Sequence, residues 1–233
     1  MRKLYYTTGS PYARAVRIVL HEKGLPFERD ETITTPTVAE RAKVTPSLQV
    51  PTLIDGEMKL WDSAVIIDYL MATYPNPEPS PGHMPFAEHL VRPERHWHDK
   101  LVLATLQTLG VSISTISQLQ WSGVRHEDNG FAIRSAERIQ HLFDWLETDL
   151  KSEHEGFVPG FVSVQDVLLA AWIMFLDQRP LRLDWRRASR PRTAALHARL
   201  LNRPSFVANP VRWWEPGVTG YTATGDPIRE HTA

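Results

Sequence analysis

The sequence contains no cysteine. This absence excludes disulfide scaffolds, thiolate metal sites, cysteine nucleophiles and dithiol redox chemistry. Long hydrophobic runs are also missing, because the longest, at residues 167–176, is half the length that a membrane-spanning helix needs. The N-terminus reaches Gly9 and Ser10 too early to contain the apolar core of a signal peptide. We therefore expect a soluble, cytoplasmic protein.

Neither sign of charge is in excess. The 26 basic and 27 acidic residues leave a formal net charge of −1, whereas dedicated binders of nucleic acid or anionic membranes carry a basic surplus. We therefore expect no nucleic-acid partner and no membrane partner. Apolar residues make up 42% of the chain, which is enough to bury a core.

Proline is concentrated in one stretch. Residues 75–85 contain five prolines in eleven positions, a density that neither a helix nor a central strand tolerates. We take residues 79–85 as a stiff linker between an N-terminal domain at 1–78 and a C-terminal domain at 86–216. Residues 217–233 are polar and rich in glycine and threonine, and we expect them to form a tail.

Strands and helices alternate before the linker, in the predicted order βαβαββα. Asp55-Gly56 between two apolar runs predicts a hairpin. Ser10 and Pro11 are the residue types that cap and begin a helix. The predicted strands are at 3–7, 27–33, 50–54 and 57–61, and the predicted helices begin at 11, 38 and 63.

Only helices are predicted after the linker. Apolar residues recur there at helical spacing, and Ser163 and Asp166 have the spacing of a capping box. The run that follows them is apolar nearly all round, so we expect it to be the buried core helix of this domain. One long or broken helix is predicted at 86–120, and further helices are predicted at 133–150, 163–176 and 193–201.

Several stretches, in this order along the chain, resemble those of cytosolic glutathione transferases of the serine type. The matching stretches are residues 10–20, 22–28, 49–53, 60–66, 163–166 and 203–206. The resemblance implies an α/β thioredoxin-like N-terminal domain that binds glutathione, followed by an all-α C-terminal domain. It also implies glutathione as co-substrate, and the N-terminal motifs are nearest to those of the tau, phi and zeta-like classes.

Ser10 aligns with the catalytic serine of these classes. The reaction needs a thiolate, and lowering a thiol pKa of about 8.5 by about 2 units requires roughly 2.7 kcal/mol. A hydrogen bond to a charged group supplies about 1.5–3 kcal/mol and a helix N-terminus about 0.3–1 kcal/mol. One hydroxyl at a helix start could therefore suffice. Ser10 could also be an ordinary N-cap, which is compatible with this role, and Tyr6, Thr7, Thr8 and Tyr12 offer alternative hydroxyls.

Further positions match the glutathione site of the family. The resemblance implies a cis bond at Val50-Pro51, with the Val50 backbone holding the cysteinyl part of glutathione; a trans proline opening a strand is the alternative. It also implies that Asp62 and Ser63 bind the γ-glutamyl end, although they could be a plain capping pair. Gln49 stands where many relatives carry a cation near the glycine carboxylate, and a surface role for it is equally consistent.

Some charged residues near these motifs have less specific patterns. Arg14 and Arg17 follow Ser10 on the predicted first helix, and one of them could favour a bound anion, but we expect two solvated or interface arginines. His96 and His98 are two apart on a helix and face different ways. With no third ligand at a suitable spacing, we expect solvated histidines and no metal site.

The resemblance implies that glutathione is conjugated to a hydrophobic electrophile, a detoxification reaction, by a homodimer. The absence of cysteine excludes the branches that use a catalytic cysteine. A zeta-like isomerase, a peroxidase or an etherase acting through Ser10 stays open, as does a non-catalytic binding module. Candidate walls of an acceptor site between the domains are Tyr12, Trp97, Leu101, Trp172, Trp213 and Trp214, each of which could instead be a core residue.

Overall fold

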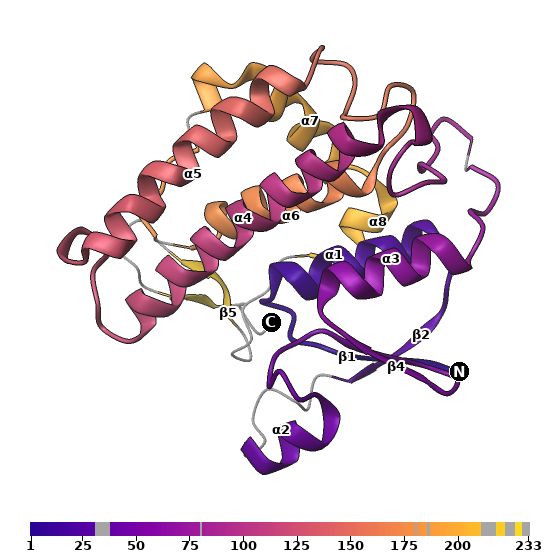
Figure 1. Cartoon of the computed structure of the whole chain (residues 1–233), viewed down its shortest axis with the longest axis horizontal. Helices are drawn as coiled ribbons and strands as arrows, with labels where there is room; N and C mark the ends of the chain where they lie inside the picture. The colour runs from indigo at the N-terminus through magenta and orange to yellow at the C-terminus, as the bar shows by residue number, and fades with distance from the viewer. Residues whose placement is uncertain are drawn as a thin grey trace. The chain divides into compact units, whose positions relative to one another are not determined.

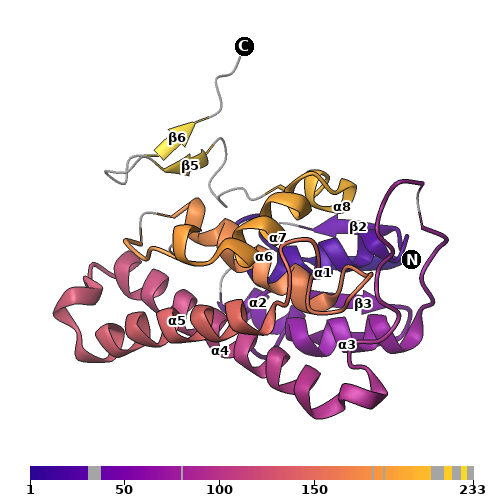
Figure 2. The same ribbon diagram turned by 90° about the horizontal axis from the view of Figure 1, so that it is seen from above.

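The structure, a computed structural model, describes residues 1–30, 38–79, 81–179, 181–185, 187–210, 218–221 and 227–229. Two compact units account for most of them. The first contains residues 1–90 and 202–210, and the second contains residues 91–201. Near the C-terminus, β5 (Val218–Tyr221) and β6 (Pro227–Arg229) pair as a separate two-stranded sheet (Figure 2). The sequence analysis did not predict these two strands.

A four-stranded mixed sheet forms the centre of the first unit (Figure 1). Its strands β1 (Arg2–Tyr5), β2 (Phe27–Asp30), β3 (Thr52–Asp55) and β4 (Met58–Trp61) lie in the order β2-β1-β3-β4. β1 is parallel to β2 and antiparallel to β3, and β3 is antiparallel to β4. Gly56, with a φ of 61°, makes the predicted hairpin turn. The predicted thioredoxin-like class is confirmed.

Two long helices cover one side of this sheet. Figure 1 shows α1 (Pro11–Glu22) and α3 (Ser63–Thr73) on that side and the short α2 (Val38–Val44) on the other. The apolar residues of α1 from Ala13 to Leu20 are fully buried, whereas α2 has no buried residue. α1 is thus the core helix of the unit, and it begins at Pro11, as the sequence predicts.

A segment from late in the chain completes the first unit. The short helix α8 (Pro204–Val207) packs against α1. Arg203 donates from Nε and Nη2 to the two carboxylate oxygens of Glu22, at 2.6 and 2.7 Å, and from Nη1 to the carbonyl of Met84 at 2.8 Å. Ser205 Oγ donates to the same carboxylate. Both partners of the ion pair are largely buried, so it fastens this segment to the end of α1.

The regular elements described in residues 91–201 of the second unit are all helices, as predicted. Its long helices are α4 (His96–Trp121), α5 (Gly130–Asp149), α6 (Val164–Asp177) and α7 (Pro191–Leu201). α4 packs against both α5 and α6. It begins at residue 96 instead of residue 86, because Pro93 disfavours helix in the residue before it and instead opens a short 3₁₀ turn, Pro93–Arg95.

The predicted capping box begins α6. The Oγ of Ser163 accepts from the Asp166 N–H at 3.3 Å, and the Asp166 carboxylate accepts from the Ser163 N–H at 2.7 Å and from the Phe157 N–H at 2.9 Å. Complete burial raises the pKa of Asp166, and these hydrogen bonds act in the opposite direction. The start of the core helix is therefore fixed by several hydrogen bonds inside the unit.

The helical stretch 93–121, which contains α4, is the one described segment long and apolar enough to cross a membrane. Its most apolar window is 44% buried, and core helices of water-soluble domains pass the same test of length and composition. Its packing against α5 and α6 matches the role of a core helix.

α4 and α6 approach closely at Gly110, and replacing this residue by alanine should lower the free energy of unfolding by about 1–3 kcal/mol. An added Cβ would stand 2.3 Å from Cζ2 of Trp172, whose ring is buried in α6. Gly130→Ala is the matched control, because its Cβ meets only the end of Arg134, at 3.7 Å, and alanine favours helix. Urea unfolding of both variants measures the difference, and a Gly110→Ala protein as stable as the parent would contradict this packing.

Candidate functional site

The predicted site residues converge at one end of the sheet in the first unit. Strand pairing places Tyr5, Thr52 and Trp61 in one row across β1, β3 and β4. Pro51 immediately precedes this row on β3 and Asp62 immediately follows it on β4. The same end of the sheet receives the turn after β1 that leads to the start of α1. The strand register therefore gathers motifs that are far apart in the sequence.

Ser10 is the N-cap of α1. Its Oγ accepts a hydrogen bond from the backbone N–H of Ala13 at 3.2 Å, and its own N–H donates to the carbonyl of Thr7 at 3.1 Å. Because the hydroxyl oxygen is the acceptor in the cap, its proton can be donated to another group. The side chain is half-buried, so a small ligand can reach it.

The Val50–Pro51 peptide bond is cis, which confirms the prediction for this bond. The turn before it contains Leu48 in the left-handed region, with a φ of 58°. The N–H of Leu48 donates to the carbonyl of Thr45 at 3.3 Å. Gln49 is exposed at the surface and Val50 is half-buried. The backbone of Val50 therefore stands at the end of the sheet, next to the row that begins β3.

Asp62 is the N-cap of α3, and Ser63 is the first residue of that helix. A single carboxylate oxygen of Asp62, Oδ1, accepts from the N–H groups of Ala64 and Val65 at 2.8 and 3.3 Å. Asp62 has a φ of 72° and a ψ of 125°, a conformation that L-residues adopt at a cost of about 1–3 kcal/mol and that clusters at ligand sites. Oδ2 accepts no hydrogen bond from the described residues and so stays available to a ligand.

The alternative hydroxyl groups differ from Ser10 in burial and in hydrogen bonding. Tyr6 is completely buried, and the Arg17 guanidinium lies over its ring at 4.7 Å, so its hydroxyl is a poor candidate for a ligand contact. Thr7, Thr8 and Tyr12 are half-buried. Ser10 is the one whose geometry at a helix start is fixed by a hydrogen bond, and it therefore remains the strongest candidate.

The expectation that Arg14 and Arg17 are solvated or lie at an interface is wrong. Each is only 1% exposed within the first unit. Arg14 Nε donates to the carbonyl of Asn209 at 2.5 Å, and its guanidinium lies 5.3 Å from the centre of the Phe206 ring. Burial and the neighbouring charge of Arg17 lower the pKa of Arg14 to about 9. The spacing of these arginines in an otherwise apolar helix was the signal that could have revealed their burial.

Several expectations for the second unit also change. His98, expected to be solvated, has its Nε2 2.7 Å from Oδ1 of Asp149, so it links the start of α4 to the end of α5. No group of histidines and carboxylates suited to a metal occurs among the described residues. Trp172 is a core residue and not a pocket wall, because it is buried against Gly110.

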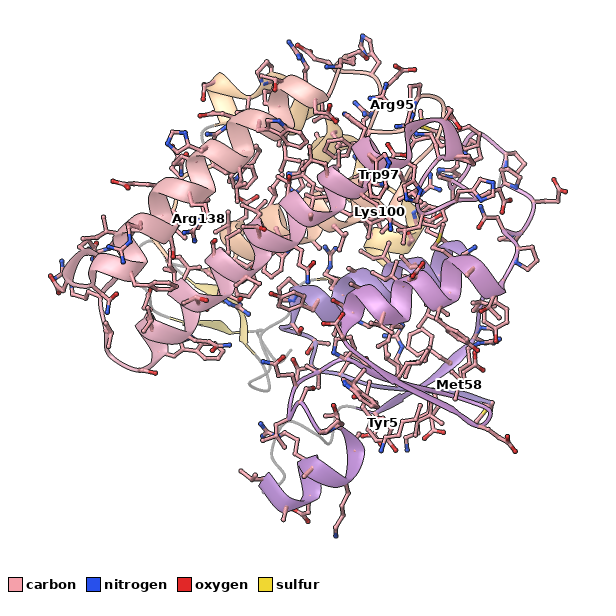
Figure 3. The ribbon with its side chains drawn as sticks, in the orientation of Figure 1. Tyr5, Met58, Arg95, Trp97, Lys100 and Arg138 are labelled. Atoms are coloured by element: carbon pink, nitrogen blue, oxygen red, sulfur yellow. The ribbon has the colours of Figure 1, made fainter. Side chains whose placement is uncertain are left out.

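The remaining candidates for an acceptor site differ in exposure. Trp97 is 79% exposed and Leu101 is 54% exposed. Figure 3 shows Trp97 and Lys100 projecting from the start of α4. A cavity of about 530 Å³ in the second unit is lined by residues of 176–189, none of which was predicted to belong to the site. Trp213 and Trp214 lie outside the described residues.

Residues 4–78 match the family model described as glutathione S-transferase, N-terminal domain. A glutathione transferase family member from Pseudomonas fluorescens, solved with bound glutathione, superposes with a TM-score of 0.72 and 20% identity over 91% of this chain and all of that one. A second, from Methylobacterium radiotolerans in complex with glutathione sulfonate, has a TM-score of 0.69 and 25% identity over 89% and 93% of the two chains.

A different name appears among the curated relatives. A stringent starvation protein A homolog from Haemophilus ducreyi is 40% identical over 67 residues, which are 28% of this chain and 31% of that protein. For the homolog from Haemophilus influenzae the match is 30% identical over 114 residues, 47% and 53% of the two chains. The chain thus spans between about a third and about half of the length of the curated relatives it matches.

The mixed sheet, its helices and the cis-proline that precedes β3 define the first unit as a thioredoxin-like domain. Residues 4–78 match the model of the glutathione S-transferase N-terminal domain, and the chain has the fold of glutathione transferases.

Proposed function

We propose that this chain is a glutathione transferase, which conjugates the glutathione thiolate to a hydrophobic electrophile. The observation that carries the proposal is the Ser10 cap. The Ser10 oxygen accepts a hydrogen bond from the N–H of Ala13, so the hydroxyl proton stays available. Ser10 also lies at the same end of the sheet as cis-Pro51 and the start of α3. Solved proteins of this fold contain bound glutathione or glutathione sulfonate, which supports glutathione as the ligand here.

Each site residue then has a chemical role. Ser10 donates its hydroxyl proton to the thiolate, aided by the N-terminus of α1. The backbone N–H and carbonyl of Val50, beside cis-Pro51, pair with the cysteinyl part of glutathione. At the start of α3, Ser63 binds the γ-glutamyl carboxylate with its hydroxyl and N–H, and the free oxygen of Asp62 faces the ammonium group. Gln49 donates its amide to the glycine carboxylate.

The proposal extends to the oligomeric state and the location of the protein in the cell. We propose a cytoplasmic homodimer with a role in detoxification. Exposed apolar side chains on each unit support self-association, since such side chains are otherwise left in water. They are Met58, Trp61 and Val65 in the first unit and Trp97 and Leu101 in the second.

A non-catalytic binding module is the second candidate. The observation that favours it is the similarity to stringent starvation protein A homologs. Under this alternative the glutathione site could be retained without turnover, and the partner would be a protein. Isomerase, peroxidase or etherase chemistry at Ser10 would use the same thiolate with a different second substrate.

The ultraviolet difference spectrum of bound glutathione against pH tests the proposal. We expect a thiolate band that titrates about 2 units below the free thiol pKa of about 8.5. Turnover with a generic aromatic electrophile should accompany this band. Glutathione binding in calorimetry without the band or turnover would favour the binding module, and no binding at all would contradict both glutathione roles.

A further inference from the structure

The region where α4 begins contains a row of charged side chains that alternate in sign. Arg92 donates from its backbone N–H and from Nε to Oδ2 of Asp99, both at 2.9 Å, and from Nη2 to Oδ1 at 2.7 Å. The imidazole of His98 lies beyond Asp99. Its Nδ1 is 3.5 Å from Oδ1 of Asp99, and its Nε2 is 2.7 Å from Oδ1 of Asp149. His98 therefore stands between two carboxylates.

This row joins three segments of the second unit. His98 belongs to the first turn of α4, and Asp149 is the last residue of α5. Arg92, which precedes the 3₁₀ turn, also donates from Nη2 to the carbonyl of Phe157 at 3.4 Å, in the stretch between α5 and α6. The attachment of the start of α4 to its neighbours therefore depends on the contacts of these side chains.

The protonation of His98 decides how well the row fits together. A neutral imidazole has one N–H donor and one acceptor, so a neutral His98 would direct a lone pair at one of its two carboxylate neighbours. The imidazolium can donate to both. Because histidine is the side chain that changes charge between pH 5 and 8, the fit of the row changes within that range.

Asp99 keeps its negative charge in this range. Its side chain is 3% exposed. Burial raises the pKa of Asp99, but the hydrogen bonds and the charge of Arg92 outweigh burial and lower this pKa overall. Glu94 and Asp149 are further acidic groups that act on Arg92. His98 thus faces a fixed anion on its own helix.

Among the residues that the structure describes, Asp99 and Asp149 are the charged groups that pair with the imidazole. With His98 protonated, two cations alternate with two carboxylates along the row. Without this proton, the side chain of Asp149, which is 11% exposed, keeps no ionic partner within the described ranges. The His98 ring is 31% exposed, so it can exchange protons with solvent.

We propose that His98 is a pH-sensitive latch: its protonated ring holds the start of α4 on the end of α5, and loss of the proton loosens this attachment. The stabilisation needs the proton, so it is complete on the acid side of the range from pH 5 to 8 and is lost as the pH rises. Trp97 and Leu101, which are 79% and 54% exposed, lie on the same turns of α4. The latch therefore sets how firmly this exposed apolar surface is held.

Hydrogen–deuterium exchange of the whole chain, read over residues 92–102 and 145–158, tests the proposal. His98→Gln replaces the imidazole by a side chain that stays neutral at every pH. We expect these segments to open about tenfold more often in His98→Gln than in the parent near pH 5.5, because a half-exposed hydrogen bond between charged groups is lost. Near pH 8 the two proteins should differ by less than about twofold.

His96→Gln is the matched control. His96 lies in the same turn of α4 and packs edge-to-face on Trp97, and it has no carboxylate partner among the described residues. Its exchange should equal that of the parent at both pH values. A loss of protection in His96→Gln as large as that in His98→Gln would overturn the proposal, since any change in this turn would then explain the effect.

Asp149→Asn removes the other end of the latch, and it should lose protection near pH 5.5 to the same extent as His98→Gln. An equal loss at both pH values would identify an ordinary packing contact and refute the latch, as would parental exchange at both. If circular dichroism shows that His98→Gln does not fold, Asp149→Asn decides by the same comparison. No glutathione is added, so the outcome does not depend on the proposed function.

Discussion

Replacing Ser10 by alanine should lower turnover at least tenfold, with little change in glutathione affinity. The hydroxyl is expected to donate to the thiolate, and a hydrogen bond to a charged group is worth about 1.5–3 kcal/mol, or about 1–2 units of thiol pKa. This rise in the thiol pKa lowers the fraction of glutathione that is thiolate at neutral pH, and turnover falls with that fraction. Steady-state kinetics with a generic electrophile and the thiolate titration measure the two effects together.

Ser63→Ala is the matched comparison for Ser10. Ser63 also opens a helix at this end of the sheet, but its proposed contact is with the carboxylate at the far end of glutathione. We expect weaker binding, with the thiol pKa of the bound fraction unchanged. Turnover at parental levels in Ser10→Ala would refute the assignment, and attention would pass to Thr7, Thr8 and Tyr12.

Replacing Arg203 by methionine should lower the free energy of unfolding by about 3–5 kcal/mol, because it leaves the carboxylate of Glu22 buried without its ionic partner. The two side chains are 8% and 11% exposed and share two short hydrogen bonds. Urea unfolding of the whole chain, followed by circular dichroism, measures the loss.

A double-mutant cycle shows whether this loss comes from the stranded charge. Glu22→Gln/Arg203→Met removes both charges, so it should be clearly more stable than Arg203→Met alone. If the double variant is as unstable as the sum of the single variants, the two residues are not energetically coupled, contrary to the geometry of the ion pair.

Local rules explain how much of the fold could be predicted. The hairpin needs only Asp55-Gly56 between two apolar runs, and the capping box of α6 needs only residues three apart, so neighbouring residues carry the whole signal. The gathering of Ser10, cis-Pro51 and Asp62 was predicted through resemblance to a family. The structure adds the physical reason, which is a register that aligns the ends of β1, β3 and β4.

Long-range contacts explain what could not be predicted. Arg14 was expected in solvent because its partner Asn209 is 195 positions away, and no pattern near Arg14 shows that α8 returns to cover it. His98 was misjudged for the same reason, since Asp149 is 51 positions away. In both cases a polar side chain contacts an element that only the folded chain brings near.

The attachment of α8 to α1 has a consequence for the order in which the protein is made. Residues 1–90 and 202–210 form one unit, but all of residues 91–201 are synthesised between them. At about 5–20 residues per second, the end of α1 waits roughly 10–40 seconds on the ribosome for Arg203 and Ser205. Glu22 and the part of α1 that packs against α8 stay uncovered during that time, so the nascent N-terminal domain should need protection until residues 203–207 have emerged.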